Sequence, residues 1–402
     1  MSKQKHEQLE ARLDHLLNES ISSAKDRERS TFDHLVSPLG GSYVLFGAGG
    51  LGQRTAAGLR TLGVEPLAFT DNNERLWNQN IAGVPVLAPA EAVRKCGSKA
   101  AFIVTIWSDS LGHPLAQIKS QLNSYGFTRV VSFVHLYWKY AETFLPYFSL
   151  DLPHKTLEQA DQVRAAFGLW ADAFSKLEYI AQVKLRLELD FSGLHCPDSG
   201  NQYFPDGLFS LLSNEVFVDC GAFNGDSIRE FLRRQGVNFG KILAFEPDAD
   251  NFSKLQKFVS TLDKSVLDKI ALFPLALDRQ KGKIHFDSAG ATHSAIRSDG
   301  ESVVDCVALD DILAGLKPTY IKMDIEGSEP EALAGAVKII EECRPVLAIS
   351  NYHRFDHLWK IPLFLSSLKV EYLLFLRPHA QATWDLICYA VPKDRSLMID
   401  EE

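Results

Sequence analysis

The stretch YIKMDIEGSE, residues 320–329, joins a short apolar run to the acidic residues Asp324 and Glu326 and to a glycine. This pattern predicts a buried strand that ends at Asp324 and is followed by a turn. The upstream stretch VFVDCGAFNGD, residues 216–226, repeats the pattern, with Gly221 and Gly225 in its turn. Because ligands of open parallel sheets bind beyond the carboxyl ends of the strands, we expect both turns to face one crevice.

The last half of the chain alternates strand-like and helix-like segments. Its apolar segments lie at Val216, Ile242, Ala271, Tyr320 and Val346. Residues 372–376 and 386–390 form a further strand pair, which suits an antiparallel edge. Ser227 and Glu230 predict a capping box at the start of the helix expected at 227–234. We therefore predict a doubly wound α/β fold with a mainly parallel sheet and an antiparallel edge strand.

A further acid follows the strand expected at residues 242–245. At this place Glu246 can accept hydrogen bonds from both hydroxyls of a ribose, and its charge strengthens them. Taken alone, Glu246 could cap a helix or face solvent, and Gly221 and Gly225 could simply form a turn. Their order of strand, glycine turn, helix, strand and acid favours the binding of a nucleotide-like cofactor.

These segments resemble the FkbM-type methyltransferases, which have the class I, S-adenosylmethionine-dependent fold. The resemblance is carried by residues 216–226, by AFEP at 244–247, by IKMDIEGSE at 321–329 and by ISNYH at 349–353. It covers roughly the last half of the chain and implies a methyltransferase that uses S-adenosylmethionine. The family generally methylates oxygen, commonly a hydroxyl of a sugar or a small natural product.

The resemblance also implies which residues bind the cofactor. Asp219, Gly221 and Gly225 would surround its methionine part. Glu246 would hold its ribose, and Ala276 and Leu277 would border the adenine. Ala222 and Pro247, next to these residues, are further candidates for cofactor binding.

Three candidates for the reaction lie at or just beyond predicted strand ends: Asp324, Glu326 and His353. Methyl transfer is an in-line displacement, so most of the rate comes from aligning the acceptor oxygen with the methyl group and the sulfur. A hydroxyl must also lose its proton, which each of these side chains could orient or receive. The two acids could instead cap the next helix, and His353 could be a packed or exposed helix residue. We predict no metal site, since Mg²⁺ usually needs further oxygen ligands, and we expect Lys322 to be solvated or ion-paired.

The first half of the chain carries a second glycine motif. GAGGLG at residues 47–52 follows a strand expected at 43–46, opens a helix and is followed after the next strand by Asp71. Gly47, Gly49, Gly52 and Asp71 thus complete a dinucleotide fingerprint.

Short segments near this motif, DNN at 71–73 and GVPV at 83–86, resemble small nucleotide-binding-like domains attached to sugar-modifying enzymes. Three interpretations stay open for this part of the chain. It binds a dinucleotide, it binds a nucleotide or nucleotide sugar, or it is a structural domain without a ligand.

Changes of pattern along the chain predict four segments. Residues 1–40 are an N-terminal helical segment, in which leucines at helical spacing give an apolar face that needs a partner. Residues 41–136 are a Rossmann-like α/β domain, 137–202 a helical bridge, and 203–402 the methyltransferase domain. The helical face could pack on the protein itself or on a second subunit of a homo-oligomer.

Composition limits the classes of function. The 402 residues carry a net charge of −9, which argues against a broad nucleic-acid footprint. No apolar run approaches the roughly 18 residues that cross a bilayer, so we expect no membrane partner and a cytoplasmic protein. The six scattered cysteines do not have the spacing of zinc or disulfide frameworks, so we expect reduced thiols.

The leading hypothesis is an O-methyltransferase that acts on a carbohydrate or small-molecule hydroxyl. The alternatives are an NAD-dependent oxidoreductase that uses the N-terminal fingerprint and a non-catalytic protein that binds a nucleotide metabolite. The acceptor pocket carries no motif. Five residues could line it or simply pack in the core: Trp170, Tyr203, Phe204, His293 and Trp359.

Overall fold

The computed structural model describes residues 3–36, 41–107, 114–198, 200, 202–287, 295–296 and 302–398. Their contacts form two compact units. We call residues 12–160 with 181–194 the N-terminal unit, and residues 1–11, 161–180 and 195–402 the C-terminal unit. The division into four segments stays a prediction. His293 lies outside the described residues.

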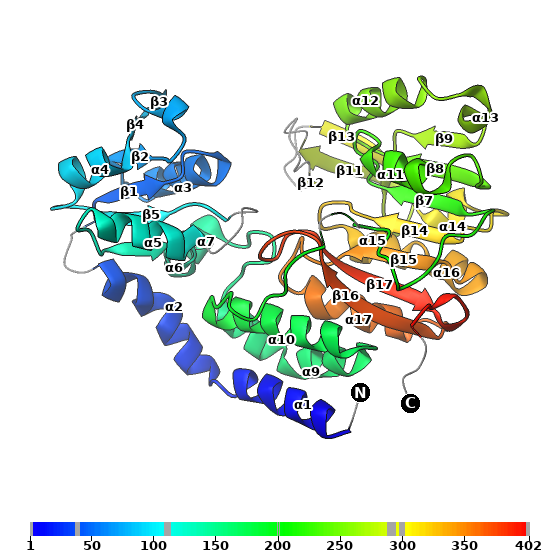
Figure 1. Ribbon diagram of the computed structural model, residues 1–402, viewed down its shortest axis with the longest axis horizontal. Helices are drawn as coiled ribbons and strands as arrows, with labels where there is room; N and C mark the ends of the chain where they lie inside the picture. Colours follow the sequence, from blue (N-terminus) through cyan, green and yellow to red (C-terminus); the bar gives the residue numbers. More distant parts are fainter. Residues whose placement is uncertain are drawn as a thin grey trace. The chain divides into compact units, whose positions relative to one another are not determined.

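The N-terminal unit contains a six-stranded sheet in the order β3-β4-β2-β1-β5-β6 (Figure 1). All neighbouring strands are parallel except β3 and β4. The strands are β1 (Tyr43–Phe46), β2 (Ala68–Thr70), β3 (Asn80–Ile81), β4 (Val84–Leu87), β5 (Ala101–Val104) and β6 (Val130–Ser132). This parallel arrangement is the α/β unit that the sequence predicts.

Helices cover both faces of this sheet. Leu45 packs with residues of α3 (Gly50–Thr61) and α6 (Phe133–Lys139), while Val44 and Phe46 pack with α4 (Pro89–Cys96) and α5 (Pro114–Ser124). Neighbouring residues of β1 therefore contact opposite layers, as the alternation of side chains along a strand requires. A short 3₁₀ turn, η1 (Glu74–Leu76), precedes β3.

The N-terminal segment forms two helices, α1 (Lys3–Leu17) and α2 (Ile21–Val36), rather than one. Leu9, Leu13 and Leu17 are buried, whereas Ile21 is 40% exposed. The predicted apolar face therefore ends with α1. The region predicted as a bridge is mainly helical, with α7 (Ala141–Phe144), α8 (Pro153–Glu158), α9 (Ala160–Leu169) and α10 (Ala173–Glu188).

The C-terminal unit is built on a seven-stranded sheet in the order β16-β17-β15-β14-β7-β8-β9 (Figure 1). The strands are β7 (Val216–Cys220), β8 (Lys241–Phe245), β9 (Ile270–Phe273), β14 (Tyr320–Met323), β15 (Val346–Ser350), β16 (Tyr372–Pro378) and β17 (Leu386–Pro392). Five are parallel, while β17 pairs antiparallel with both β15 and β16. The predicted fold class, a mainly parallel sheet with an antiparallel edge, is confirmed.

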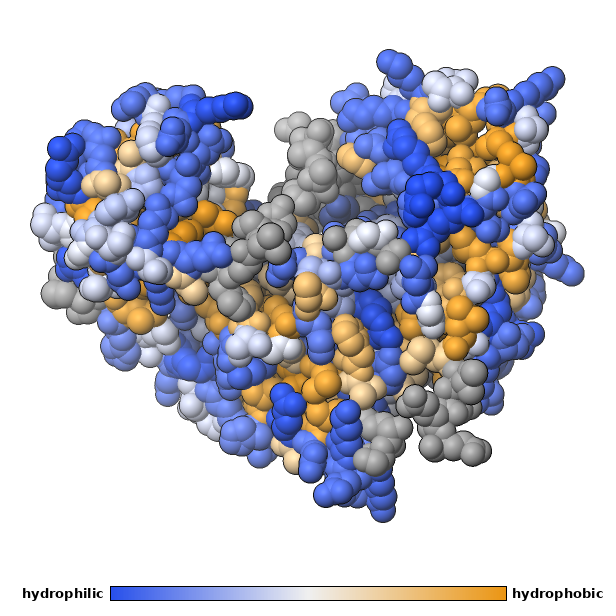
Figure 2. All heavy atoms as spheres, viewed as in Figure 1, coloured by the Kyte–Doolittle hydropathy of each residue, from blue (hydrophilic) through white to orange (hydrophobic). Residues whose placement is uncertain are grey.

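Helix α11 (Asp226–Gln235) shows how periodicity sets the layers. It buries Ile228 and Phe231 and exposes Arg229 and Arg233, and Figure 2 shows hydrophilic side chains over it. The predicted capping box is wrong. The helix starts from Gly225 in the left-handed region, and the Ser227 hydroxyl donates to Asp219 instead of capping.

The remaining helices of this unit are α12 (Ala249–Val259), α13 (Lys264–Leu267), α14 (Leu309–Ile312), α15 (Glu329–Ala334), α16 (Val337–Cys343), α17 (His357–Ser367) and the 3₁₀ turn η2 (Lys393–Arg395). The helices α15 and α16 follow each other closely and are interrupted at Gly335. A Cβ at Gly335 would come within 2.3 Å of the Asp278 carbonyl oxygen, so this close approach of two backbones separates α15 from α16.

A small second sheet was not predicted. It has the order β10-β13-β11-β12, with β10 (Ala276–Leu277), β11 (Gly282–Asp287), β12 (Ala295–Ile296) and β13 (Ser302–Val307). The strands β10 and β12 have two residues each and are too short to show a period in the sequence, whereas β11 and β13, with six residues each, were missed.

The β16 edge of the large sheet is covered by the chain that leads into α10 and by the first turn of that helix. The Leu374 carbonyl of β16 accepts a hydrogen bond from Ala171 N (2.9 Å), and Ser175 Oγ accepts one from Leu376 N (2.9 Å). Asp172 pairs with Arg377 (2.5 Å). These contacts satisfy backbone groups that an open edge strand would leave free.

Two expectations from composition can be compared with the structure. Over the described ranges, no helix is both long and apolar enough to cross a bilayer. All six cysteines are free; Cys196 is exposed, Cys343 is partly buried, and the other four are buried.

Candidate active site

Three neighbouring strands bring the predicted site residues to one edge of the sheet. Asp324 N donates to the Cys220 carbonyl at the end of β7 (3.0 Å), and Gly221 N donates to the Phe245 carbonyl at the end of β8 (3.0 Å). Asp324, Gly221 and Glu246 therefore follow adjacent strands in the order β14, β7, β8. This is the place where open α/β sheets bind ligands.

Gly221 is required by the space between these strands. Its φ is +80°, and a Cβ there would lie 1.9 Å from the Asp324 carbonyl oxygen. Any other residue would have to push the backbone of Asp324 away and adopt the left-handed conformation. The backbone positions of the glycine turn and the acid after β14 are thus coupled.

Glu246 is tied to the glycine turn through its carboxylate. One oxygen accepts from Phe223 N (2.8 Å) and the other from Asp248 N (2.9 Å). Burial raises the pKa of Glu246 to about 7, although the two backbone hydrogen bonds, which stabilise the ionised form, act to lower it. A carboxylate has about four acceptor positions, so about two remain for other donors. The two vicinal hydroxyls of a ribose could donate hydrogen bonds to these remaining positions.

Asp219 binds the protein's own side chains. Its carboxylate accepts from the Ser227 hydroxyl and pairs with Lys322 Nζ at 3.1 Å. Lys322 Nζ also donates to the Gly221 carbonyl (2.6 Å). Burial alone would lower the pKa of Lys322, but Asp219 and other carboxylates raise it. Lys322 is therefore buried and ion-paired, which is one of the two alternatives expected from the sequence.

The other predicted cofactor residues lie around these groups. Ala222 N donates to the Phe245 carbonyl (2.9 Å), and Gly225, with φ +86°, precedes α11. Pro247 lies between Glu246 and Asp248, whose side chain caps α12 through Asn251 N (2.9 Å). Ala276 and Leu277 are buried and pair with β13 in the small sheet.

Asp324 accepts hydrogen bonds from two side chains and faces a third. Its Oδ2 accepts from the Tyr203 hydroxyl (2.7 Å), and its Oδ1 accepts from Ser350 Oγ (2.8 Å) and lies 3.3 Å from His353 Nε2. Tyr203 was one of five candidate pocket residues, while Ser350 was missed. Phe204, Trp170 and Trp359 are buried in the core.

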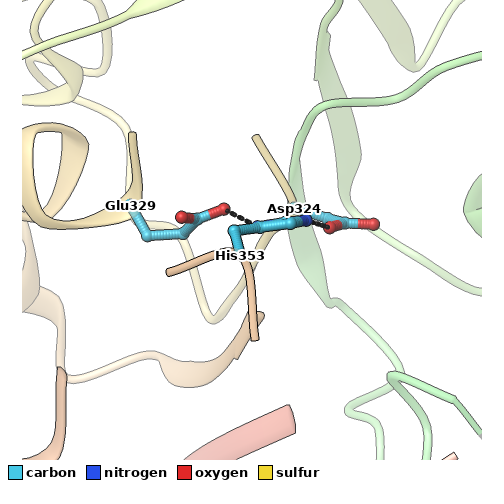
Figure 3. Close-up of side chains that lie close together, drawn as sticks. All are labelled: Asp324, Glu329 and His353. Carbon is cyan, nitrogen blue, oxygen red and sulfur yellow. Dashed lines mark hydrogen bonds and ion pairs between the residues drawn. The ribbon is translucent and has the colours of Figure 1, made fainter. Parts of the chain in front are cut away.

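His353 lies between Glu329 and Asp324 (Figure 3). Its Nδ1 is 2.7 Å from Glu329 Oε1, while its Nε2 faces Asp324 Oδ1 (3.3 Å) and Glu326 Oε2 (3.7 Å). Burial alone would lower the pKa of His353, but these carboxylates, Glu329 first, raise it to about 10. Burial raises the pKa of Glu326 to about 8, although His353 opposes this shift.

Glu329 shapes the turn that carries Glu326. Its Oε1 accepts from Ile325 N (3.0 Å) and Gly327 N (3.4 Å), and the side chain is fully buried. Burial opposes ionisation, but His353 lowers the pKa of Glu329 to about 2. The sequence prediction missed this residue, although the three acids at 324, 326 and 329 are close enough in the chain to have signalled a shared cation.

The N-terminal motif shows a similar arrangement. The Asp71 carboxylate accepts from Ala48 N (2.9 Å) and Asn73 N (2.8 Å). A Cβ at Gly52 would lie 1.9 Å from the Gly47 carbonyl, whereas Gly49 has open space where a side chain would be. Gly47 and Gly52 are therefore needed by the fold itself.

Comparison with known proteins assigns the C-terminal unit. The family model described as the methyltransferase FkbM domain matches residues 219–377, a segment that begins at Asp219 and includes Glu246, Asp324 and His353. These residues match the FkbM methyltransferase domain. The FkbM domain therefore supplies the strand ends described above, and the chain contains a methyltransferase domain.

Solved structures agree with this fold. Methyltransferase FkbM from Methylobacillus flagellatus KT shares 22% identity and superposes with a TM-score of 0.72 over 93% of this chain and 99% of its own. A methylase structure from Clostridium thermocellum, with 14% identity, covers 50% of this chain and 97% of its own at a TM-score of 0.32. The first likeness shows the fold, and the second is too weak to carry an argument. No curated relative matches the chain.

Breaking the Asp219–Lys322 pair should destabilise the FkbM domain. We expect Lys322→Met to lower the free energy of unfolding by about 3–5 kcal/mol, because it leaves Asp219 buried without its cation. Adding Asp219→Asn should recover much of this loss, since the double variant has no buried charge at this place. Urea unfolding of the two variants measures both effects.

The matched control is Lys338→Met on α16, where the lysine is exposed. It should change the free energy of unfolding by no more than about 0.5 kcal/mol. Equal losses of unfolding free energy in Lys322→Met and Lys338→Met would contradict the interpretation of Asp219 as a structural anchor. So would a loss in the double variant that equals the sum of the losses caused by Lys322→Met and Asp219→Asn alone.

Proposed function

We propose that the protein is an S-adenosylmethionine-dependent O-methyltransferase that acts on a hydroxyl of a carbohydrate or small molecule. The observation that carries the proposal is the placement of Glu246 and Asp324 after strands that flank the glycine turn of β7. One acid suits a ribose and the other suits an acceptor hydroxyl. A single sheet edge thus has groups for both reactants.

The cofactor side of the proposal rests on the donor and acceptor groups of the chain. When bound, S-adenosylmethionine supplies an electrophilic methyl group on a sulfonium sulfur. Glu246 would accept hydrogen bonds from the ribose hydroxyls, and Gly221 and Ala222 would border the methionine part through backbone that carries little side chain. Asp219 would act indirectly, since its carboxylate already binds Ser227 and Lys322.

The assignment of residues to the methyl acceptor rests on how exposed their side chains are. The side chains of Asp324 and Glu326 are each 25% exposed, whereas those of His353 and Glu329 are at most 1% exposed. An incoming hydroxyl can therefore reach the two acids more readily than the imidazole. We assign Asp324 to orient the hydroxyl or accept its proton as the oxygen–carbon bond forms and the sulfur–carbon bond breaks. His353 would position the acids.

Two measurements test the proposed function directly. Calorimetric titration of the full chain with S-adenosylmethionine and its demethylated product should show saturable binding to one site. Transfer of a labelled methyl group to a panel of sugars and hydroxylated small molecules should give acid-stable O-methyl products. Folded protein that shows no heat and no thermal shift with either cofactor form would reject the proposal.

Removing the Glu246 carboxylate should weaken cofactor binding. Hydrogen bonds to a charged group are worth about 1.5–3 kcal/mol, so Glu246→Ala should raise the Kd for S-adenosylmethionine at least about tenfold. The matched control is Asp71→Ala, which removes the corresponding acid of the N-terminal unit and should leave this Kd unchanged. Equal Kd values for Glu246→Ala and wild type would remove the ribose assignment.

Cofactor affinity should depend on pH through Glu246. The ribose hydroxyls donate to the ionised carboxylate, whose pKa in the free protein is raised to about 7 by burial. Affinity should therefore be constant above this pH and fall by up to about tenfold per pH unit below it. Titrations between about pH 5.5 and 8.5 should show this fall in wild type, and Glu246→Gln should lose it. An unchanged slope in the variant would assign the titration to another group.

Asp324→Asn should affect turnover more than affinity. The amide keeps the size of the side chain but cannot accept a proton as a carboxylate does, so kcat should fall about 100-fold or more. The Kd for S-adenosylmethionine should change little. As a control, Ser350→Ala removes one hydrogen bond to Asp324 and should cost far less. A normal kcat in Asp324→Asn with the best acceptor of the panel would exclude Asp324 as the base.

A further inference from the structure

The cluster around His353 contains more acidic groups than one hydroxyl acceptor requires. Asp324, Glu326 and Glu329 surround a single buried imidazole, and a group of Asp324, Glu329 and His353 offers ligand atoms within 4.8 Å of one another. Three carboxylates around one imidazole favour a cation among them. Acidity alone does not make a site, so the two edges of the imidazole must be considered separately.

The Nδ1 edge of His353 is already used. Nδ1 lies 2.7 Å from Glu329 Oε1, a hydrogen-bond distance that leaves too little room for an ion between the two atoms. Glu329 is completely buried and also holds the turn of residues 325–327. A carboxylate that accepts from one imidazole nitrogen fixes the tautomer and presents the other nitrogen to a metal.

The Nε2 edge is open to a ligand. Nε2 is buried and has no hydrogen-bond partner within the described part of the chain, and the His353 side chain is only 1% exposed. It faces Asp324 Oδ1 at 3.3 Å and Glu326 Oε2 at 3.7 Å. Ligand atoms that bind one divalent ion at roughly 2.0–2.2 Å are separated by roughly 3–3.6 Å. The Nε2–Asp324 Oδ1 distance lies within this range, and the Nε2–Glu326 Oε2 distance is slightly longer than its upper end.

The backbone at Glu326 supports the same geometry. Its φ is +55°, a left-handed conformation that is unfavourable for glutamate. This conformation lets Asp324 and Glu326, only two residues apart, both approach Nε2. Glu329 maintains it by accepting hydrogen bonds from the amides on either side of Glu326.

We propose that Asp324 Oδ1, Glu326 Oε2 and His353 Nε2 bind a divalent first-row cation such as Mn²⁺, with Glu329 positioning the imidazole. The imidazole nitrogen favours a first-row transition ion over Mg²⁺ or Ca²⁺, which prefer oxygen alone, and the two carboxylate oxygens suit Mn²⁺ among such ions. This assignment goes beyond the sequence analysis, which predicts no metal. The binding site stands on geometry alone. The role of the ion, which would bind the acceptor oxygen and lower the pKa of its hydroxyl, rests on the proposed function.

The test uses MnCl₂ and the full chain after treatment with a chelator. Electron paramagnetic resonance of free Mn²⁺ should show one ion bound per chain, and pulsed measurements should show coupling to one nitrogen. Glu326→Gln should weaken Mn²⁺ binding at least about tenfold, as expected for loss of a charged ligand. Glu331→Gln, the same substitution at an exposed residue of α15, should bind Mn²⁺ like wild type.

His353→Gln provides a second arm because it should abolish the nitrogen coupling even if some Mn²⁺ still binds. Circular dichroism of each variant establishes that it is folded. No bound Mn²⁺ in wild type, equal affinity in Glu326→Gln, or no nitrogen coupling would overturn the site. Saturable S-adenosylmethionine binding without Mn²⁺ binding would reject the site and keep the proposed function. Mn²⁺ binding without any cofactor binding would support the site and reject the proposed function.

Discussion

The site depends most on the ion pair between the buried ammonium group of Lys322 and Asp219. Asp219 lies at the end of β7, while Lys322 also donates to the carbonyl of Gly221 and its own strand leads directly to Asp324. Charges this deeply buried are stable only when they are paired and hydrogen-bonded. The pair therefore fixes the glycine turn and the end of β14 relative to each other. The close approach of Gly221 to the Asp324 backbone makes that alignment tighter still.

The sequence predicts the sheet well because its signals are local. Apolar runs, glycine turns and the acids that follow strands identified every parallel strand of the C-terminal sheet and placed Asp324 and Glu246 at its carboxyl edge. The predictions fail where the partner of a side chain lies far away in the sequence. Ser227 has the spacing of a capping residue, yet it donates to Asp219, a buried acid eight residues earlier. The partners of Asp324 come from residues 203, 350 and 353, and no period connects such positions.

The two units hold their first glycine turn with the same pattern of hydrogen bonds. In each, an acid after the second strand accepts a hydrogen bond from an amide of the first glycine turn: Glu246 from Phe223 N, and Asp71 from Ala48 N. Each acid also binds the amide two residues after itself. This arrangement stabilises the turn whether or not a ligand is present. It explains why a fingerprint for nucleotide binding is also a sound structural element, and why the motif alone does not establish a ligand.

The left-handed backbone of Glu326 carries an implication for how this domain can change. Glycine adopts such a φ without cost, whereas glutamate there loses about 1–2 kcal/mol. Replacing Glu326 by glycine would therefore relieve this strain but remove a ligand of the proposed cation site. Variants selected for stability alone would favour the glycine, so stability and the proposed cation binding oppose each other at this position.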